Sequence, residues 1–517
     1  MHEAGTERRD ADRIRSVLIL GGGTAGWMAA AVLAKSFGRA LDIALVESDD
    51  IGIIGVGEAT IPQIRTLNAF LGIDEDDFVR RTKASFKLGI AFEGWYRPDS
   101  RYIHAFGDIG QPLGILPYHH YWLRARALGT GIDLWDASLN ARAAFAERMG
   151  RIERVGDTRL GGIRHAFHFD AGLYAKVLRG LAEGLGVVRH EGIVTDVALD
   201  GTSGHIRTLK LRDGREIGAD FFIDCSGFRG RLIAGALGIG YEDWSHWLPV
   251  DRAIAVPCAH DGRMRPYTQA IARKAGWQWR IPLQHRTGNG HVYVSALLSD
   301  EEAHAILMAN LEGEALAEPR LLRFTTGIRS SVWHKNCVAL GLASGFLEPL
   351  ESTSIHLIQS FLGRLVQHFP RHAAETAPMA LFNHQCRFEM ERIRDFLILH
   401  YHANQRRGED FWDDRREMAI PDTLAGKIAL FRESGRLVRE GEELFAETGW
   451  LQLLIGQGIL PESWHPLADT LSESDLLAFH HSIAKIVART AESLPTHAEF
   501  VAGIAAQAES RRSITSS

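Results

Sequence analysis

Hydrophobic residues near the start of the chain fall into a strand, a glycine-rich turn, a helix and a second strand. Residues 17–20 and 43–46 are short apolar runs of the length of buried parallel strands. Residues 27–34 between them are small and apolar, as in a helix that packs closely against a sheet. The pattern therefore predicts a strand–turn–helix–strand unit.

The turn of this unit carries glycine at positions that suit a nucleotide. Gly21, Gly23 and Gly26 let the backbone turn tightly and bring the helix N-terminus close to a pyrophosphate. Glu47 follows the last glycine by about 20 residues, where an acidic side chain meets a ribose hydroxyl. This spacing predicts a dinucleotide site, and by itself it does not distinguish FAD from NAD.

The pattern further along predicts more sheet and then mostly helix. Residues 63–84 are amphipathic with a helical period, and residues 86–92 and 219–225 have the composition of buried strands. The second of these strands is expected to return to the sheet of the first motif. Residues 338–346 predict another strand, and the chain beyond about 356 is almost wholly helical in pattern.

Three sets of side chains stand out within these elements. Lys87 lies in an apolar run, where an edge charge that reaches solvent is favoured over a partly desolvated amine in a cleft. His104 and Phe106 share one face of an extended segment, which suits an aromatic ligand or a core pair. Trp277 and Trp279 form either a rigid aromatic wall or ordinary sheet core.

Composition narrows the class of protein. The net charge of −6 over 517 residues argues against a nucleic-acid binder, which needs a basic face. The four cysteines are far apart and include no CxxC pair, so we expect reduced thiols and no metal site. The first dozen residues are polar, and no run approaches the ~18 apolar residues of a spanning helix. We therefore expect a cytoplasmic protein with no membrane partner.

Six stretches together resemble the flavin-dependent halogenases, most closely the tryptophan/indole branch. They lie within a match from about 15 to about 460, at residues 21–26, 55–58, 86–87, 277–282, 348–353 and 394–396. The W-x-W-x-I-P stretch separates this family from flavin monooxygenases that share the nucleotide-binding fold. The resemblance implies an enzyme that uses reduced FAD, O₂ and chloride or bromide to halogenate an electron-rich aromatic compound.

The resemblance also implies roles for single residues. Lys87 matches the catalytic lysine, which holds hypohalous acid by a hydrogen bond or as a haloamine. Glu351 matches the catalytic glutamate, which polarises the oxidant or takes the ring proton. The residues implied around this pair contact substrate (His104, Phe106 and Phe445), bind halide (Thr353 and Ser354) or separate substrate from flavin (Trp277, Trp279, Ile281 and Pro282).

The implied fold is α/β, with an FAD-binding Rossmann-like module of the two-dinucleotide-binding-domain type. We expect this module to be discontinuous, at 1–110, 150–235 and 335–365, with a β-rich part inserted at 236–334 and a helical substrate-covering part at 366–517. The residues expected to contact FAD are Gly21, Gly23, Thr24, Ala25, Gly26, Glu47, Gly57, Ala59, Asp224, Gly341, Ser352 and Ile355.

The chain departs from the tryptophan halogenases at two places. Ser354 stands where glycine is common, which leaves the preference between chloride and bromide open. Around 433–450 the tyrosines and the acidic residue that grip a free amino acid do not line up. A site that lacks those hydrogen bonds discriminates poorly, so indole or an indole derivative is favoured over free L-tryptophan.

Two other classes remain as alternatives. One is a flavin-dependent aromatic monooxygenase, whose product would not depend on halide. The other is a non-catalytic binding protein on the same nucleotide-binding architecture. The expected partners are a separate flavin reductase that supplies diffusing FADH₂ and a small aromatic substrate, with a homodimer as one expected assembly.

Overall fold

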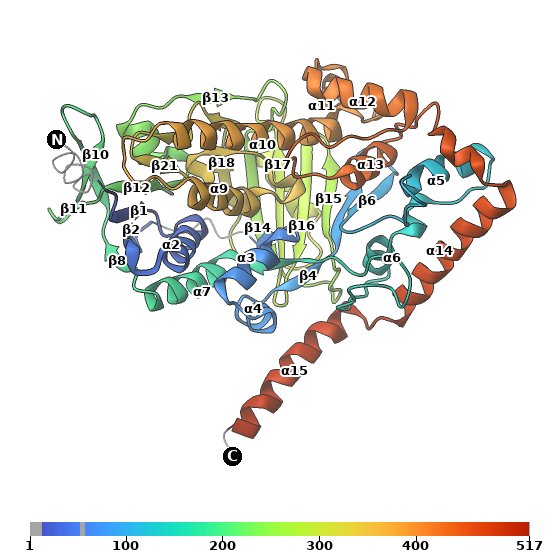
Figure 1. Cartoon of the computed structure of the whole chain (residues 1–517), viewed down its shortest axis with the longest axis horizontal. Helices are drawn as coiled ribbons and strands as arrows, with labels where there is room; N and C mark the ends of the chain where they lie inside the picture. Colours follow the sequence, from blue (N-terminus) through green and yellow to red (C-terminus); the bar gives the residue numbers. More distant parts are fainter. Residues whose placement is uncertain (1–12, 52–56, 516–517) are drawn as a thin grey trace, which may run out of the picture.

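A computed structural model describes residues 13–51 and 57–515. Residues 55 and 56, in the stretch at 55–58 that carries part of the resemblance, lie outside the described residues. The first motif forms the centre of a six-stranded sheet (Figure 1). Its strands, in spatial order, are β20 Trp333–His334, β21 Cys337–Ala339, β12 Phe221–Asp224, β1 Ser16–Leu20, β2 Asp42–Glu47 and β8 Val188–Glu191.

The strand predicted at 219–225 does return to this sheet. β12 pairs with β1 in parallel, with Asp224 opposite Leu20, and the strand predicted at 338–346 forms in part as β21 beside it. α2 (Thr24–Phe37) follows β1 and packs against α7 (Ala171–Gly184) and α9 (Ser354–His368). Its alanines at 29–31 are fully buried, which lets the helix lie close to its neighbours.

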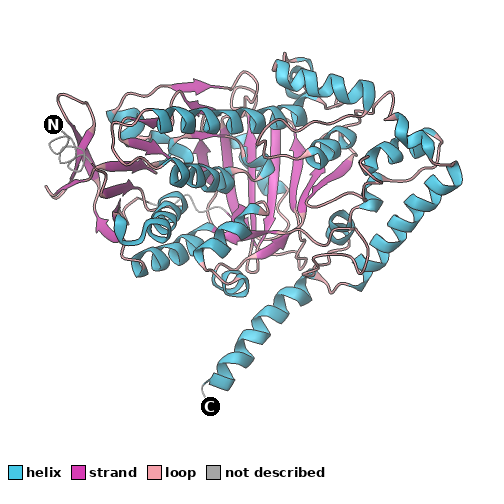
Figure 2. Cartoon of the chain, viewed as in Figure 1, coloured by secondary structure: helices cyan, strands magenta, loops and turns pink. Residues whose placement is uncertain are grey.

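A seven-stranded sheet forms the middle of the molecule (Figures 1 and 2). Its order is β18 Arg320–Arg323, β14 Arg252–Cys258, β17 Thr287–Tyr293, β16 Gly276–Pro282, β15 Thr268–Arg273, β5 Gly89–Glu93 and β6 Arg101–Ala105. β5 and β6 come from within 1–110, yet β5 pairs with β15 of the part expected as an insertion, and β6 pairs with β5 at the edge of the same sheet. The domain boundaries stay a prediction.

Three smaller sheets complete the β-structure of the described residues. They are β3 Gly57–Ala59, β7 Ala166–Asp170 and β4 Ser85–Lys87; β11 Glu216–Gly218, β10 Ile206–Leu211 and β9 Val194–Leu199; and β13 Tyr241–Asp243, β19 Gly327–Arg329 and β22 Gly345–Phe346. The remaining α-helices before α9 in the described chain are α3 Gln63–Leu71, α4 Glu75–Arg81, α5 Tyr118–Ala127, α6 Leu139–Phe145 and α8 Asp300–Ala309.

Helices dominate the described chain after 354, as the pattern predicts. Figure 1 shows α10 running the length of the upper face and α15 projecting from the body. The α-helices that follow α9 in the described chain are α10 Ala377–His402, α11 Asp410–Glu417, α12 Asp422–Ser434, α13 Glu447–Gly456, α14 Glu473–Ser493 and α15 His497–Thr515. None of the helices in the described chain combines the length and apolar character that a membrane crossing requires.

Two local predictions are wrong in detail. The helix expected at 63–84 is two helices, because Gly72 takes a left-handed φ of 78° and ends α3. The strand expected at 86–92 changes sheet at Leu88: β4 pairs with β7, and β5 pairs with β6. A Cβ at Gly89 would lie 2.6 Å from the His104 carbonyl oxygen, so the close antiparallel pairing of β5 with β6 requires glycine there.

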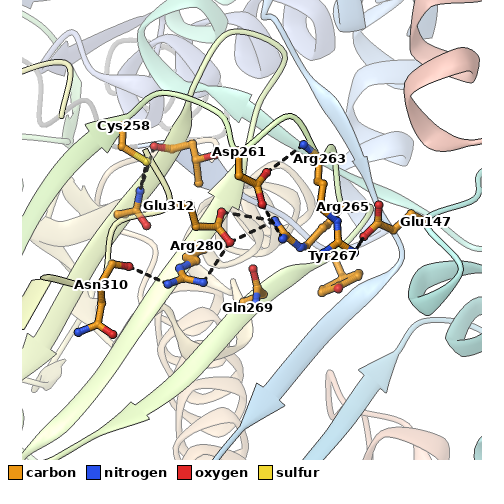
Figure 3. A network of polar contacts seen from close by, with 12 residues as sticks. Glu147, Cys258, Asp261, Arg263, Arg265, Tyr267, Gln269, Arg280, Asn310 and Glu312 are labelled. Atoms are coloured by element: carbon orange, nitrogen blue, oxygen red, sulfur yellow. Dashed lines mark hydrogen bonds and ion pairs between the residues drawn. The ribbon is translucent and has the colours of Figure 1, made fainter. Parts of the chain in front are cut away.

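β16 is fixed from the side opposite its tryptophans. Arg280 alternates with Trp279 and Ile281 along the strand, so its side chain lies on the other face. Glu312 lies 3.0 Å from Arg280 and 3.2 Å from Arg265, and Arg280 also donates to the Asn310 carbonyl (Figure 3). This ionic network holds the strand that carries the aromatic wall.

Candidate active site

A cavity of about 1020 Å³ opens at the carboxyl ends of β1 and β2. Such a place at the edge of a parallel sheet is where α/β proteins bind nucleotides. Its lining includes many of the residues expected to contact FAD, namely Gly21, Gly23, Thr24, Ala25, Glu47, Ala59, Gly341, Ser352 and Ile355. Gly57 lies in β3, at the border of the described residues.

The glycine turn is shaped by close approaches that exclude side chains. A Cβ at Gly22 would lie 1.3 Å from Glu47 Oε2, and a Cβ at Gly26 would lie 1.8 Å from the Gly21 carbonyl oxygen. Glu47 is held by Arg189, whose Nε donates to Oε1 at 2.6 Å. The bare backbone at the helix N-terminus and the fixed carboxylate beside it fit a dinucleotide such as FAD.

Asp224 does not line this cavity. Its side chain is fully buried, and its two oxygens accept hydrogen bonds from the backbone N–H groups of Ser226, Leu232 and Ile233. The carboxylate therefore organises the turn after β12, and it has no direct place in the expected contact with FAD. Gly26 acts in a similar indirect way, through the close approach to Gly21.

Lys87 is completely buried, so the interpretation of an edge charge that reaches solvent is wrong. Its Nζ donates to Ser352 Oγ at 2.7 Å and to the Thr60 carbonyl at 2.9 Å, and it lies 5.4 Å from the centre of the Phe106 ring. Burial lowers the pKa of the Lys87 amine to about 7, and the negative charge of Glu351 opposes this shift.

Glu351 is buried between two imidazoles. His104 Nδ1 lies 2.9 Å from Oε2, and His400 Nε2 lies 2.8 Å from Oε1. Burial by itself would raise the pKa of Glu351, but the charge and hydrogen bonds of His104 and His400 outweigh it and lower the pKa to about 2. A carboxylate in this place is therefore ionised at neutral pH.

The second imidazole was not assigned a role from the sequence. His400 lies in α10, and its Nδ1 is 3.2 Å from the hydroxyl of Tyr102 in β6. Gln457 in turn donates from Nε2 to the Tyr102 oxygen at 3.1 Å. The sequence contains the triplet His400-Tyr401-His402, but nothing local indicates which of the three faces a buried carboxylate.

The expected halide segment is the start of α9. Ser352 takes a left-handed φ of 58°, which is strained for a residue with a side chain. The strained turn places Thr353 at the N-cap of a 15-residue helix, whose first N–H groups have no partner within the helix. Thr353 is buried, with no hydrogen-bond partner for its hydroxyl in the described chain, and Ser354 lines the cavity.

The expected barrier lies on β16. Trp279 and Ile281 line the cavity, whereas Trp277 does not. Trp277 Nε1 donates instead to Glu348 Oε2 at 2.6 Å, and the Tyr401 hydroxyl donates to the same oxygen at 2.6 Å. Pro282 pairs with Thr287 at the end of the strand. Glu348, which the sequence did not single out, thus ties the aromatic strand to α10.

The residues expected to contact substrate lie close to Glu351. Phe445 stacks on Phe396 with ring centres 3.8 Å apart, and both rings lie within 6 Å of the His104 ring. Phe106 follows β6, two residues after His104. The structure thus brings His104, Phe106 and Phe445 together with the Lys87–Glu351 pair and with Phe396, which lies in the motif at 394–396.

The described residues contain neither a cluster of metal ligands nor a disulfide. No group of three or more His, Cys, Asp or Glu in that part of the chain could hold a metal ion. The four cysteines are free thiols, as expected.

Comparison with known proteins agrees with this geometry. Residues 16–473 match the tryptophan halogenase family. The tryptophan 6-halogenase SttH of Streptomyces toxytricini is 34% identical, over 94% of this chain and 98% of its own. The structure of Xcc4156, a flavin-dependent halogenase from Xanthomonas campestris, superposes with a TM-score of 0.92 at 50% identity, over 95% of this chain and 98% of its own. BrvH, a flavin-dependent halogenase from Brevundimonas sp. BAL3, gives 0.92 at 46% identity, over 95% and 100%.

The fold and the site define a flavin-dependent enzyme of mixed α/β architecture with an FAD-binding fold. The chain belongs to the tryptophan halogenase family. As a flavin-dependent halogenase, it uses FADH₂ and a halide. The comparisons give no support to the monooxygenase alternative.

Proposed function

We propose that this enzyme chlorinates or brominates indole or an indole derivative, with Lys87 and Glu351 as the catalytic pair. One observation carries the assignment. Lys87 Nζ donates to Ser352 Oγ at 2.7 Å, and Ser352 both follows Glu351 in the chain and lines the FAD cavity. The amine and the carboxylate are therefore adjacent, buried and next to the cofactor cavity.

Each member of the pair suits one side of hypohalous acid. The chemistry that FADH₂ would supply when bound is the two-electron reduction of O₂; the other two electrons that O₂ accepts would come from halide, which becomes hypohalous acid while water is released. The Lys87 amine offers a hydrogen-bond donor in a water-poor place, or a nucleophile when neutral, because burial brings its pKa to about 7. Glu351 stays anionic beside it and offers an acceptor.

Halide and FAD have separate supports in this proposal. The N–H groups at the start of α9, around Thr353 and Ser354, would hold the halide. Gly21 to Ala25, with Glu47, would hold the pyrophosphate and ribose of FAD. Trp279 and Ile281 would stand between flavin and substrate, which keeps the ring from reacting at the cofactor itself.

Free tryptophan is the less favoured substrate. Besides Glu351, the His104 ring lies near two aromatic rings, those of Phe396 and Phe445. In the loop before α13, buried Glu443 forms an ion pair with Lys427 at 3.0 Å, which balances its charge, although neither carboxylate oxygen has a hydrogen-bond partner in the described residues. Indole needs only the aromatic contacts, whereas an amino-acid head group needs polar partners that the chain does not offer in the family's pattern.

The supply of reduced flavin is part of the proposal. A separate reductase would deliver diffusing FADH₂, and the cytoplasm is the proposed place because all four cysteines are free. A homodimer stays a prediction.

The test offers indole and tryptophan in parallel to the enzyme with FADH₂, O₂ and bromide or chloride. Mass spectrometry should show a halogenated product whose yield is greater for indole than for tryptophan. A hydroxylated product that forms without halide would establish the monooxygenase instead. Absence of any modified product, with FADH₂ consumed, would contradict the proposed substrate class.

A further inference from the structure

We propose that His104 is a catalytic residue, the general base that removes the ring proton, and that Glu351 orients it. This inference rests on the proposed function and assigns proton removal to His104 in place of Glu351. Glu351 would act on the proton through His104, as the carboxylate of a carboxylate–histidine pair does.

Both oxygens of Glu351 are already occupied by imidazole nitrogens. His104 Nδ1 lies 2.9 Å from Oε2, and His400 Nε2 lies 2.8 Å from Oε1. The exposed fraction of the carboxylate side chain is 1%. Each oxygen keeps a further lone pair, but the carboxylate is less exposed than the His104 side chain, at 1% against 9%, so the more accessible base is a histidine nitrogen.

His400 cannot be that base, because both of its nitrogens have partners. Its Nδ1 accepts from the Tyr102 hydroxyl, and the Tyr102 oxygen accepts from Gln457 Nε2. This arrangement assigns the proton of neutral His400 to Nε2, which donates to Glu351. His400 is also completely buried, so it serves as a fixed donor behind the carboxylate.

His104 has the opposite arrangement. Its Nδ1 faces a carboxylate, which can only accept, so neutral His104 carries its proton on Nδ1 and keeps a lone pair on Nε2. Within the described chain Nε2 has no hydrogen-bond partner, and it is not among the fully enclosed polar atoms. A Cβ at Gly449 would lie 3.1 Å from Nε2, so a glycine at this position leaves more room beside the nitrogen than a larger residue would.

The surroundings of His104 suit an arene. Phe396 and Phe445 lie on one side, with ring centres 5.5 and 5.9 Å from the imidazole. Phe106 lies two residues along the chain, and Lys87 Nζ is 5.4 Å from the centre of its ring. An aromatic ring between these groups would meet the amine that holds the oxidant and the imidazole that accepts the proton.

The step balances without any further reagent. Hypohalous acid transfers its halogen to a ring carbon, and its hydroxyl leaves as water or hydroxide. The C–H bond at that carbon then breaks, and its electron pair restores the aromatic ring. The proton goes to His104 Nε2, and the resulting imidazolium is stabilised by Glu351 until the proton passes to solvent.

The test is His104→Asn, in which the amide N–H occupies the place of Nδ1–H toward Glu351 while the base is lost. Indole and fully ring-deuterated indole are halogenated in separate, matched reactions whose rates are compared, in the presence of methionine, which consumes hypohalous acid released to solution. We expect wild-type enzyme to use both equally, because proton loss is fast. The variant should be about 100-fold slower or more and should favour the protium compound, because proton loss has become limiting.

One further variant distinguishes a His104 that accepts the proton from a His104 that only contacts the substrate, and another is held in reserve. Tyr102→Phe removes the hydroxyl that hydrogen-bonds His400 Nδ1 and leaves His104 Nε2 intact. This variant should therefore show no isotope preference, whatever its rate. His104→Gln is the second choice if His104→Asn does not fold, as judged by thermal unfolding and FAD binding.

An unchanged rate in the folded His104 variant, or a slower rate with no isotope preference, would overturn the inference. Wild-type enzyme that halogenates nothing would overturn the proposed function instead, so the two failures are distinguishable.

Discussion

Glu348 and Glu351 lie three residues apart with both side chains buried, yet their pKa values move in opposite directions. Burial raises the pKa of Glu348 to about 7, although the hydrogen bonds from Tyr401 and Trp277 oppose the shift. Burial acts on Glu351 too, but two histidines bring its pKa to about 2. Opposite pKa shifts of two nearby carboxyl groups keep Glu351 ionised while Glu348 is protonated over a wider range of pH.

Glu348→Gln should stabilise the protein at high pH. The pKa of Glu348 is raised on folding, so its stabilising effect is complete below its unfolded value of 4.5 and is lost as the pH rises through about 7. Glutamine keeps an acceptor for Trp277 and Tyr401 and does not ionise. The difference in unfolding free energy between variant and wild type should shift by about 3 kcal/mol in favour of the variant from pH 4.5 to pH 8. A difference that stays constant with pH would contradict the raised pKa.

Glu351→Gln should abolish halogenation and destabilise the fold. An amide cannot accept from both histidines, so its NH₂ group would face one imidazole N–H, a buried clash of donors that costs on the order of 1–3 kcal/mol. The measurements are product formation and thermal unfolding, with Glu348→Gln as the matched control for a nearby buried carboxyl. Wild-type rates in folded Glu351→Gln would refute the proposed role of this residue.

Lys87→Ala should abolish halogenation while the oxidation of FADH₂ by O₂ continues. The amine is the proposed holder of hypohalous acid, whereas flavin oxidation needs only the cofactor cavity, which Lys87 does not line. Product is measured by mass spectrometry and flavin oxidation by absorbance. Lys274→Ala, at an exposed lysine, is the control and should keep both activities. Retained halogenation in Lys87→Ala would refute the assignment.

Lys87→Met should stabilise the protein most at low pH. The pKa of Lys87 falls from 10.5 to about 7 on folding, so the penalty of its buried charge is complete below pH 7 and is relieved as the pH rises toward 10.5. The advantage of the variant in unfolding free energy should therefore fall by about 2–3 kcal/mol between pH 6 and pH 9. Denaturant titrations of both proteins at the two pH values measure this, and an advantage that grows with pH would show the sign to be wrong.

Gly22→Ala should weaken FAD binding at least about tenfold, or ~1.4 kcal/mol. The added Cβ would lie 1.3 Å from Glu47 Oε2, so the turn or the glutamate must move out of its place beside the cavity. Flavin fluorescence titration gives the Kd. Gly180→Ala is the control, because a Cβ at this helical position meets nothing within 4 Å. Equal affinity in the Gly22 variant would mean that the turn tolerates a side chain.

The parts of this protein that the sequence determined are those encoded within a few neighbouring residues. The strand–glycine–helix–strand unit, the alternation that puts Trp277, Trp279 and Ile281 on one face, and the helix start at Ser354 all depend on local backbone preferences. Those preferences can be inferred from the sequence without knowing which other elements pack against the segment. The residues expected to contact FAD were predicted in the same way, and most of them line the cavity, whereas the Asp224 carboxylate accepts hydrogen bonds within its own turn.

Only the tertiary structure decided the surroundings of the catalytic pair. Glu351 meets His104 across 247 residues and His400 across 49, and Gln457 reaches Tyr102 across 355. The burial of Lys87 likewise depends on Thr60 and Ser352 from other elements. The packing of sheets and helices determines which side chain faces a buried charge. That packing depends on the free energy of the whole chain, so it cannot be inferred from a short stretch of sequence.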